Sequence, residues 1–557
     1  MEIPFTDSRR SNLNNSHPAY IYYIIIIIVS FFTFFINNEI IPADLMEARN
    51  LATAQEMVRE GNYLLPTMNG ELRIAKPPLP TWIAAGIEHI CPGNLVVQRC
   101  MTGAIATLMT LFLFLLVSRL TRNKNIALIS SLVLATSFNI LIMGRTATWD
   151  IYCHSFMLGA IYFMVLAFSG EGKQWKNFIL AGIFIGLSFL GKGPVSFYAL
   201  LLPFLISYFI VYHPSARKKA LPIVTMVVVF LFVSFWWMAY VYIFHADMAL
   251  GIAQQESSSW LNHNVRPWYY YWQFPAEAGI WALFLVTAIV YFFVYKKQEF
   301  RKEYKFSIIW FISSLVLLSI IPEKKTRYLL PILIPGAISI AFYIFYSAKG
   351  LAAKGEKLIF RINACLIAVI MVALPIALYI IFYEKNEISL PVLILSAVLS
   401  WALAIYMFKS LFGKKGINVI GTFSAIVLFM MMVAAVCLIP IGQLFINPER
   451  HSISLLRDNQ EVRDLPFYYI DGEQMRMELV YEADRTISPL NISDSLSVRN
   501  KLPFVILSGK PVDSIFQGKN IVIKKIDTFD NNWRKPGHKR YNWELVREVA
   551  ILQEKEK

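Results

Sequence analysis

A polar, charged stretch, residues 44–82, separates two apolar runs near the start of the chain. Two acids, Asp44 and Glu47, lie at its head, where a carboxylate could take a proton from a hydroxyl or amine during group transfer. A structural role is the alternative, since Asp44 could cap a helix over Leu45–Glu60 with Glu47 as its capping-box partner. A third acid, Asp150, opens a later apolar run, where it could position a reactant or cap that helix.

Basic side chains in this stretch and in later turns could surround an anionic group such as a phosphate or pyrophosphate. They are Arg49, Lys76, Lys192, Lys325 and Arg327, and Arg145 and Lys324 lie in turns of the same kind. For each residue the alternative is snorkelling, in which the charged end of the side chain reaches lipid head groups. Several such residues in turns between apolar runs favour a basic cavity.

A loop at 245–275 contributes aromatic residues, among them Trp268 and Tyr269. Such residues usually form a belt at the membrane surface, and a wall over a lipid or sugar is the alternative. His263 is the one candidate metal ligand in the loop, and no partner for it is evident. The five cysteines form no Cys-x-x-Cys or Cys/His cluster, so free thiols are predicted. No cofactor is predicted, although a divalent metal stays an option.

The scaffold that positions these residues must lie in a membrane. The chain is 57% hydrophobic and 16% charged, whereas charged residues make up about 25% of soluble proteins. A helical span needs about 20 apolar residues, and about thirteen runs qualify. They lie near 20–36, 95–117, 126–143, 151–169, 177–191, 195–211, 220–244, 276–295, 306–321, 328–346, 361–383, 389–409 and 418–438. The first is expected to be an uncleaved span, because no small-residue cleavage site follows it.

Lysine and arginine gather in alternate loops, for example at 217–219, 296–305 and 409–415. If the N-terminus with Arg9 and Arg10 is cytoplasmic, all these loops are cytoplasmic as well. The candidate site residues and the C-terminal tail then face the other side, which is the periplasm of a Gram-negative inner membrane. The net charge of +15 is explained by this topology, so no nucleic-acid partner is predicted.

The tail has the composition of a small soluble α/β domain. Strand-length apolar runs occur at 466–470, 504–507 and 521–526, with a helical pattern at 473–483. We therefore expect a polytopic α-helical transmembrane domain over 1–440, with a first outer loop at 44–92. A C-terminal α/β domain over 441–557 is expected to follow it.

Taken together, these positions resemble a known family. The matched motifs are Glu47-Ala48-Arg49, Gln55-Glu56-Met57, Gly61-Asn62-Tyr63, Pro66, Asn69-Gly70, Lys76-Pro77-Pro78-Leu79 with Trp82, Asp150, Gly191-Lys192-Gly193, Pro267-Trp268-Tyr269-Tyr270, and Lys325 through Tyr328-Leu329-Leu330-Pro331. They are similar to those of lipid-dependent glycosyltransferases of the GT-C fold, notably the lipid A aminoarabinose transferases and, more distantly, the protein O-mannosyltransferases. This chain departs from the family pattern at Met46, where an aspartate is typical, and at Ala75, where many relatives have glutamate.

The resemblance implies an inverting glycosyltransferase that moves a sugar from a polyprenyl-phosphate donor to a lipid A-like glycolipid or a protein. It implies catalytic roles for Asp44, Glu47 and Asp150. It also implies donor-phosphate binding by Arg49, Lys76, Lys192, Lys325 and Arg327, and substrate binding by Tyr328, Trp268 and Tyr269. Membrane lipids would surround the spans. A transporter of lipid-linked sugars is the alternative, but it predicts inverted repeats and charges at mid-membrane depth.

Overall fold

The computed structural model describes residues 18–555 except 41, 171–172, 218, 263, 296–298, 352, 385–387, 415, 444–445 and 518. The chain forms two compact units. The helical unit consists of Met1–Asn37, Cys100–Arg145 and Trp149–Leu438, and the mixed unit consists of Asn38–Arg99, Thr146–Thr148 and Ile439–Lys557. The first outer loop thus falls in the mixed unit, and the domain boundary at 440 stays a prediction.

Eight helices among the described residues are long and apolar enough to cross a membrane, or nine if one bent pair counts as a span. They are Leu95–Thr121 (α4), Trp149–Ser169 (α7), Ala220–Phe244 (α10), Arg301–Ile320 (α14), Thr326–Lys349 (η5 and α15), Lys354–Tyr383 (α16 and η6), Leu390–Phe412 (α17) and Val419–Gly442 (from α18 onward). The bent pair is Trp268–Glu277 with Gly279–Val294, and it turns by 100°. A polytopic helical fold is confirmed, whereas the count of thirteen spans is not.

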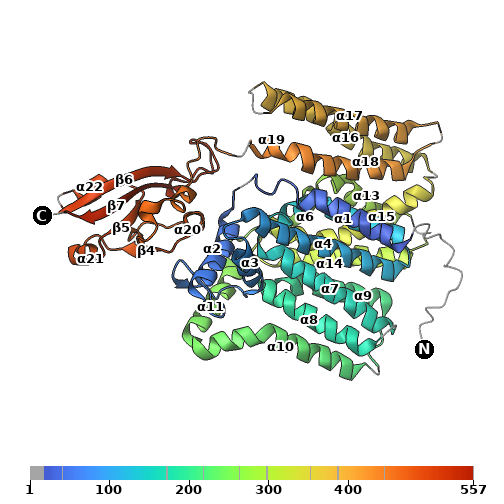
Figure 1. The fold of residues 1–557 in the computed structure, drawn as a ribbon. Helices are drawn as coiled ribbons and strands as arrows, with labels where there is room; N and C mark the ends of the chain where they lie inside the picture. Colours follow the sequence, from blue (N-terminus) through green and yellow to red (C-terminus); the bar gives the residue numbers. More distant parts are fainter. Residues whose placement is uncertain are drawn as a thin grey trace. The chain divides into compact units, whose positions relative to one another are not determined.

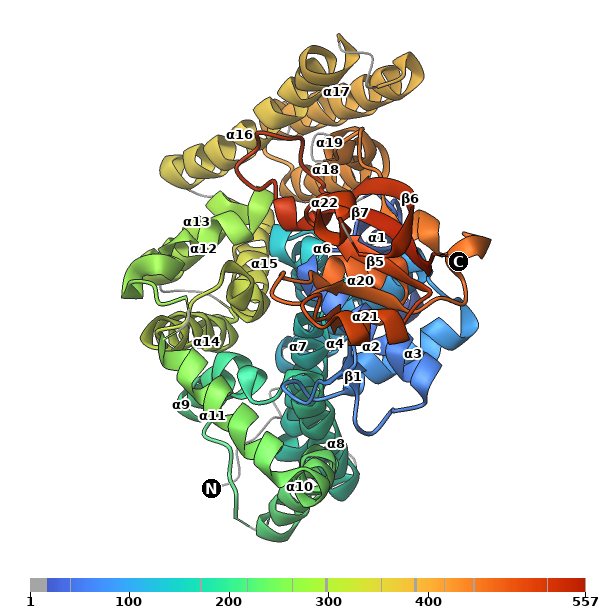
Figure 2. The same ribbon diagram turned by 90° about the vertical axis from the view of Figure 1, so that its left-hand side faces the viewer.

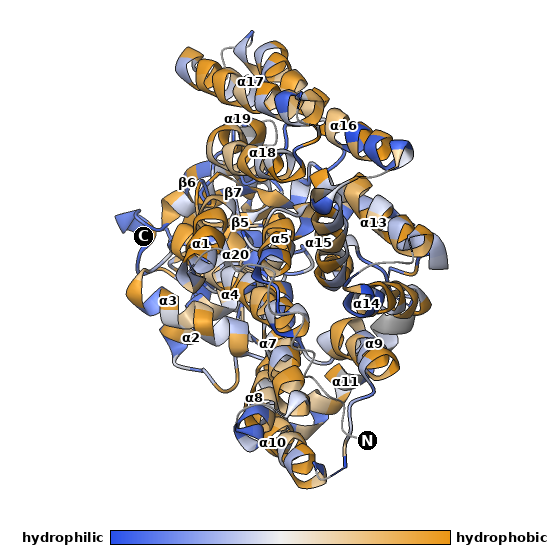
Figure 3. Cartoon of the chain, turned by 90° about the vertical axis from the view of Figure 1, so that its right-hand side faces the viewer, coloured by the Kyte–Doolittle hydropathy of each residue, from blue (hydrophilic) through white to orange (hydrophobic). Residues whose placement is uncertain are grey.

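Shorter helices complete the helical unit. They are Ala19–Phe34 (α1), Lys124–Ala135 (α5), Phe138–Met143 (α6), Gln174–Lys192 (α8), Phe197–Leu201 (η2) with Leu202–Tyr212 (α9), and Ala246–Asn262 (α11). Most of the Thr326–Lys349 span is buried, whereas α10 and α17 are largely exposed. Figure 3 shows these two exposed helices to be mainly hydrophobic. Such apolar surfaces suit contact with lipid tails.

Glycines bring α8 close to its neighbours. Helices α7, α8 and α10 lie side by side (Figure 1). A Cβ on Gly182 would lie 2.5 Å from the carbonyl oxygen of Met226, and a Cβ on Gly186 would lie 2.5 Å from Val233 of α10. Such small-x-x-x-small spacing permits close helix packing in membranes. Gly191 likewise packs against the backbone of Cys153 in α7, which brings the end of α8 to the start of α7.

The mixed unit contains a five-stranded sheet of order β4-β3-β5-β7-β6. Its strands are Phe467–Ile470 (β3), Ile487–Leu490 (β4), Phe504–Ser508 (β5), Ile521–Asp530 (β6) and Val546–Glu554 (β7). β3 pairs in parallel with β4 and β5, and β7 is antiparallel to β5 and β6. The predicted strands at β3, β5 and β6 are confirmed. The helix predicted over 473–483 is present but begins only at Met477, and it spans Met477–Ala483 (α20). Strands β4 and β7 were not predicted from the sequence.

The first loop folds into two helices and a small hairpin. They are Leu45–Glu60 (α2), Leu79–Ile90 (α3), Thr67–Met68 (β1) and Glu71–Leu72 (β2). Helix α2 packs against α3 and α20 (Figure 2). Ala48 and Leu51 of α2 share one hydrophobic core with Val505 and Val549 of the sheet. The opposite face of the sheet packs on Ser495–Asn500 (α21) and Val512–Phe516 (α22). All five cysteines are free thiols, as predicted.

Candidate active site

A buried ion pair lies where α7 begins and α8 ends. Lys192, the last residue of α8, donates a hydrogen bond from Nζ to Oδ1 of Asp150, the second residue of α7. Their side chains are only 5% and 1% exposed. A carboxylate in the first helical turn and an ammonium in the last turn each complement the helix dipole. Gly191 makes this pairing possible, because it has no side chain to separate the end of α8 from Cys153 in α7.

Three cations surround the ring of Tyr328, which lies in the 3-10 helix Thr326–Ile332 (η5). Nζ of Lys192 lies 5.1 Å from the ring centroid, Nζ of Lys325 lies 5.6 Å away and the guanidinium carbon of Arg327 lies 5.9 Å away. Nε of Arg327 also lies 3.9 Å from Oδ2 of Asp150. These distances fit cation–π attraction. The structure therefore brings together five of the residues singled out from the sequence.

This cluster retains capacity to bind a ligand. Oδ2 of Asp150 and Nε of Arg327 are buried, and neither has a hydrogen-bond partner among the described residues. Lys325 pairs with Glu323, whose Oε1 lies 2.5 Å from its Nζ. Three cations thus face two acids, and the cluster has a net positive charge. Buried donors and acceptors without partners are costly, so a ligand that offers an anionic acceptor to Arg327 and a donor such as a hydroxyl to Asp150 would stabilise this arrangement.

The aromatic loop is tied to the basic turn. Residues Val265 and Glu323 form an antiparallel bridge, and the amide of Arg266 donates to the carbonyl of Pro322 over 3.2 Å. The hydroxyl of Tyr271 donates to the carbonyl of Lys325 over 3.3 Å. Trp268 and Tyr269, in the 3-10 helix Trp268–Gln273 (η3), have exposed side chains and contact each other edge to face. They therefore offer an open aromatic surface.

In the mixed unit, the carboxylate of Glu47 accepts three hydrogen bonds. Arg99, near the start of α4, donates from Nε to Oε1 over 2.9 Å and from Nη2 to Oε2 over 2.7 Å. The amide of Ala147 adds a third bond to Oε1 over 2.8 Å. Glu47 is 1% exposed. The expectation that Glu47 completes a capping box is therefore wrong, because its carboxylate is turned to Arg99 instead of the helix end.

Asp44 is exposed and caps α2, as one of the two sequence interpretations predicted. Its Oδ1 accepts from the amide of Met46 over 2.8 Å and from that of Glu47 over 2.9 Å. Arg49 and Lys76 are both half-buried in the mixed unit. Nε of Arg49 has no hydrogen-bond partner among the described residues. Lys76 precedes the Pro77-Pro78 pair that leads into α3.

Other residues of the first loop hold its shape. Glu56 is buried, and its carboxylate accepts from the hydroxyl of Thr67 over 2.5 Å and from the amides of Asn69 and Gly70 over 2.7 and 2.9 Å. Asn69 in turn exchanges two hydrogen bonds with the backbone of Ile487 in β4. The motif residues Glu56, Asn69 and Gly70 therefore stabilise the β1–β2 hairpin and attach it to the sheet.

Two of the basic turn residues have structural roles. Arg145 donates to the backbone carbonyls of Thr33 and Ile36 at the end of α1, over 2.6 and 2.5 Å. Lys324 donates to the carbonyl of Ile321 over 2.6 Å, after the end of α14. Burial lowers the pKa of Lys324. Both side chains satisfy helix-end carbonyls, which otherwise lack partners.

No group of three or more potential His, Cys, Asp or Glu metal ligands occurs among the described residues. His263 lies outside them. The candidate metal ligand of the aromatic loop thus stays a prediction.

Comparison with known proteins shows what this architecture is similar to. Residues 75–238 match the family model for dolichyl-phosphate-mannose-protein mannosyltransferase. The whole chain is similar to the crystal structure of ArnT from Cupriavidus metallidurans bound to undecaprenyl phosphate. The TM-score is 0.66 at 14% identity, over 96% of this chain and 97% of that one. This chain has the GT-C fold of ArnT. The predicted resemblance and fold class are therefore confirmed.

Sequence relatives agree with the structural match. The undecaprenyl phosphate-alpha-4-amino-4-deoxy-L-arabinose arabinosyl transferase of Shewanella sediminis is 26% identical over 411 residues, which cover 68% of this chain and 72% of that protein. An uncharacterised protein of Aquifex aeolicus is 27% identical over 348 residues, which cover 62% of this chain and 66% of that protein. The GT-C resemblance is thus supported by sequence as well as by fold.

Two residues of these networks were not singled out from the sequence. Arg99 binds Glu47 across 52 positions of sequence, and Tyr271 bonds to the backbone of Lys325. Arg99 could have been found, because an arginine within an apolar run needs a polar partner. The sequence offered no signal for which acid that partner would be.

Proposed function

We propose that this protein is an inverting glycosyltransferase that takes a sugar from a polyprenyl-phosphate donor and passes it to a lipid or protein acceptor. The GT-C fold shared with ArnT and the arabinosyl transferases among its relatives support this proposal. We place the reaction at the periplasmic face of a bacterial inner membrane, on the basis of the distribution of basic loops. A lipid A-like glycolipid is the acceptor that the relatives favour.

The observation that carries the proposal is the cluster of Lys192, Lys325 and Arg327 around Tyr328. We assign the donor phosphate to it. Three cations at one place can neutralise a phosphate, and Arg327 can offer paired N–H donors to two phosphate oxygens. Arg49 and Lys76 of the first loop are proposed as further phosphate ligands. Trp268 and Tyr269 are proposed to contact the polyprenyl chain or the sugar.

The proposed reaction is a single displacement. An acceptor oxygen attacks the anomeric carbon of the sugar, and the bond from that carbon to the phosphate oxygen breaks. The electron pair of the broken bond leaves with the polyprenyl phosphate, whose added negative charge the basic cluster stabilises. The proton of the acceptor passes to a carboxylate. Attack on the face opposite the leaving group inverts the anomeric configuration.

Among the first-loop acids, we assign the role of base to Asp44. Its side chain is exposed, and a base must reach the proton that it removes. Glu47 accepts three hydrogen bonds and is buried, so we assign it a positioning role. Asp150 is proposed to orient the sugar or acceptor through the oxygen that lacks a partner. The transporter alternative has no support from the comparisons.

Transfer of labelled sugar from polyprenyl-phosphate donors to membrane lipids tests the proposal. Wild-type protein in proteoliposomes should form a covalent product, whereas Lys192→Ala and Asp44→Asn should lose about a hundredfold or more of the rate. Lys349→Ala removes an exposed lysine of a surface ion pair and is the matched control. Movement of donor across the bilayer without a covalent product would reject the glycosyltransferase. Full activity in both site variants would reject the site.

A further inference from the structure

The loop that joins β6 to β7 carries a dense positive charge. Residues 533–543, here called the basic loop, contain four lysines and arginines, one histidine, three aromatic residues and no acid. The cations are Arg534, Lys535, Lys539 and Arg540, and the aromatic residues are Trp533, Tyr541 and Trp543. The proposed reaction uses none of these residues. Their composition therefore needs a separate explanation.

The basic loop presents its charges to solvent. Lys535, Lys539 and Arg540 are exposed, and no ion pair joins any of the three to another residue that the structure describes. Trp543 is 72% exposed. Charge and aromatic surface are thus displayed together.

The acids on either side of the basic loop have other partners. Asp530 accepts from the hydroxyl of Tyr541 over 2.9 Å and from the side-chain amide of Asn532 over 2.8 Å. Glu544 lies 3.5 Å from the guanidinium of Arg476 and accepts from the side chain of Asn542 over 3.1 Å. Both carboxylates therefore have partners other than Lys535, Lys539 and Arg540, whose charges stay available to a ligand.

A pair of asparagines closes the base of the basic loop. The side chain of Asn532 donates to the carbonyl of Asn542 over 2.9 Å, and the amide of Asn542 donates to Oδ1 of Asn532 over 2.8 Å. Asn532 is buried. Since both strands that lead into the loop belong to the sheet, the basic loop is held on a fixed support. Less entropy is then lost on binding than for a free basic tail.

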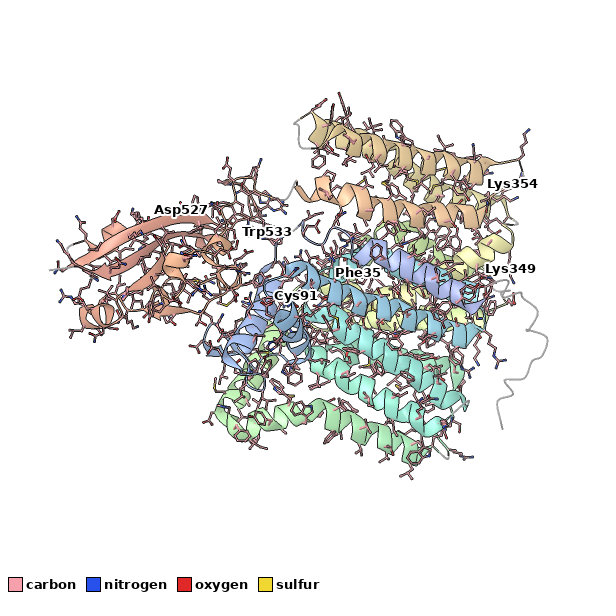
Figure 4. All side chains as sticks on the ribbon, viewed as in Figure 1. Phe35, Cys91, Lys349, Lys354, Asp527 and Trp533 are labelled. Atoms are coloured by element: carbon pink, nitrogen blue, oxygen red, sulfur yellow. The ribbon has the colours of Figure 1, made fainter. Side chains whose placement is uncertain are left out.

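Chain connectivity keeps the basic loop within reach of the membrane. Trp533 lies at the end of the β6–β7 hairpin away from α22 (Figures 1 and 4). There, His451 and Asp530 exchange two backbone hydrogen bonds of 3.1 and 2.9 Å. His451 follows Gly442, the last residue of a candidate membrane span, by nine residues. Nine residues extend over about 30 Å at most.

We propose that the basic loop binds the phosphate head groups of anionic lipids at the membrane surface. Clustered lysines and arginines are attracted to anionic lipids, each by about fivefold in binding. Tryptophan and tyrosine favour the interface between lipid and water, where one part of the ring system is apolar and the other is wet. The combination fits a lipid surface better than it fits an acidic protein, because the chain already carries membrane spans. This inference does not depend on the proposed reaction.

Hydrogen–deuterium exchange of the full-length protein in lipid nanodiscs tests the inference. Peptides covering residues 531–545 should exchange about fivefold or more slowly in discs rich in phosphatidylglycerol than in discs of phosphatidylcholine. Salt at about 1 M should abolish the difference, since it shortens the screening length to about 3 Å. Free inorganic phosphate added to phosphatidylcholine discs should not reproduce it, which separates a lipid surface from a soluble anion.

Matched charge variants complete the test. The loop variant combines Lys535→Gln, Lys539→Gln and Arg540→Gln, and the control combines Arg463→Gln, Arg499→Gln and Lys510→Gln, three exposed cations elsewhere in the mixed unit. The loop variant should lose the lipid-dependent protection, and the control should keep it. Unchanged exchange in peptides of β5 would show that the variants are folded. Equal protection in both lipids, or full protection in the loop variant, would overturn the inference.

Discussion

Arg99 holds both carboxylate oxygens of Glu47 in a two-pronged ion pair, through bonds of 2.9 and 2.7 Å. The same carboxylate binds the amide of Ala147, and Asn50 of α2 binds the carbonyl of Ala147 over 3.0 Å. Two side chains of α2 thus bind the backbone amide and the carbonyl of Ala147. Ala147 lies three positions before Asp150 in the chain. We therefore regard Glu47 as a residue that fixes the backbone leading to a proposed site residue.

The first prediction concerns this ion pair. Arg99→Met should lower the free energy of unfolding by about 3–5 kcal/mol, because it leaves the buried Glu47 carboxylate without its charged partner. The double variant with Glu47→Gln should lose less than the sum of the two single losses. Thermal melting of the purified protein in detergent measures both. An unchanged melting temperature for Arg99→Met would contradict the role we assign to this pair.

The second prediction separates stability from activity at Asp150 and Lys192. Lys192→Met should destabilise the protein by about 3–5 kcal/mol, and adding Asp150→Asn should restore part of that loss, because the unpaired buried charge is removed. Activity should stay low in the double variant, since the proposed phosphate ligand is still missing. The matched control is Lys349→Met, which breaks an exposed pair with Glu299 and should cost about 1 kcal/mol or less.

Recovery of both stability and transfer rate in the double variant would contradict our assignment. It would mean that Lys192 serves only to neutralise Asp150. Melting curves and the transfer assay on the same preparations distinguish the two cases.

Local signals in the sequence predicted much of the fold. The range of α2 and its cap follow from Asp44 and the helical pattern after it, and both match the structure. The strand-length apolar runs in the tail were likewise sufficient to predict β3, β5 and β6. The strand β4, with a proline at position 489, carries a weak local signal. Nearby residues determine such elements, so one sequence is enough to find them.

Long-range pairing could not be predicted in the same way. Nothing in the sequence indicates that Ala48 and Leu51 share a core with Val505 and Val549, more than 400 residues away. In the same way, Lys192 and Tyr328 were both placed on the outer side of the membrane, but their proximity depends on helix packing through Gly191. The sequence identified the residues of this cluster, and the tertiary fold determined which of them meet.

The third prediction concerns the ring of Tyr328. Tyr328→Leu should raise the KM for the polyprenyl-phosphate donor by about tenfold, because the three cations lose the aromatic face that holds them together. Tyr328→Phe keeps that face and should bind the donor nearly as well as wild type. Initial rates over a range of donor concentrations give both values. A Phe variant as impaired as the Leu variant would assign the effect to the hydroxyl and not to the ring.

The last prediction is a pH dependence of stability that arises at Glu88, at the end of α3. Glu88 is 6% exposed, and burial raises the pKa of its carboxyl group despite a hydrogen bond of 2.7 Å from the amide of Gly93. The folded protein therefore holds this proton more tightly than the unfolded chain does. The resulting stabilisation is complete below the ordinary pKa of glutamate and is lost as the pH rises through the raised pKa.

Glu88→Gln keeps an acceptor for Gly93 but cannot ionise. The melting temperature of wild type should therefore fall relative to that of Glu88→Gln as the pH is raised above the ordinary pKa of glutamate, about 4.3, because only the wild-type carboxyl group ionises. Glu60→Gln removes an exposed acid of the same loop and is the matched control. Parallel profiles for wild type and Glu88→Gln would show that Glu88 is equally ionised in the folded and unfolded states. Burial would then have no effect on its proton affinity.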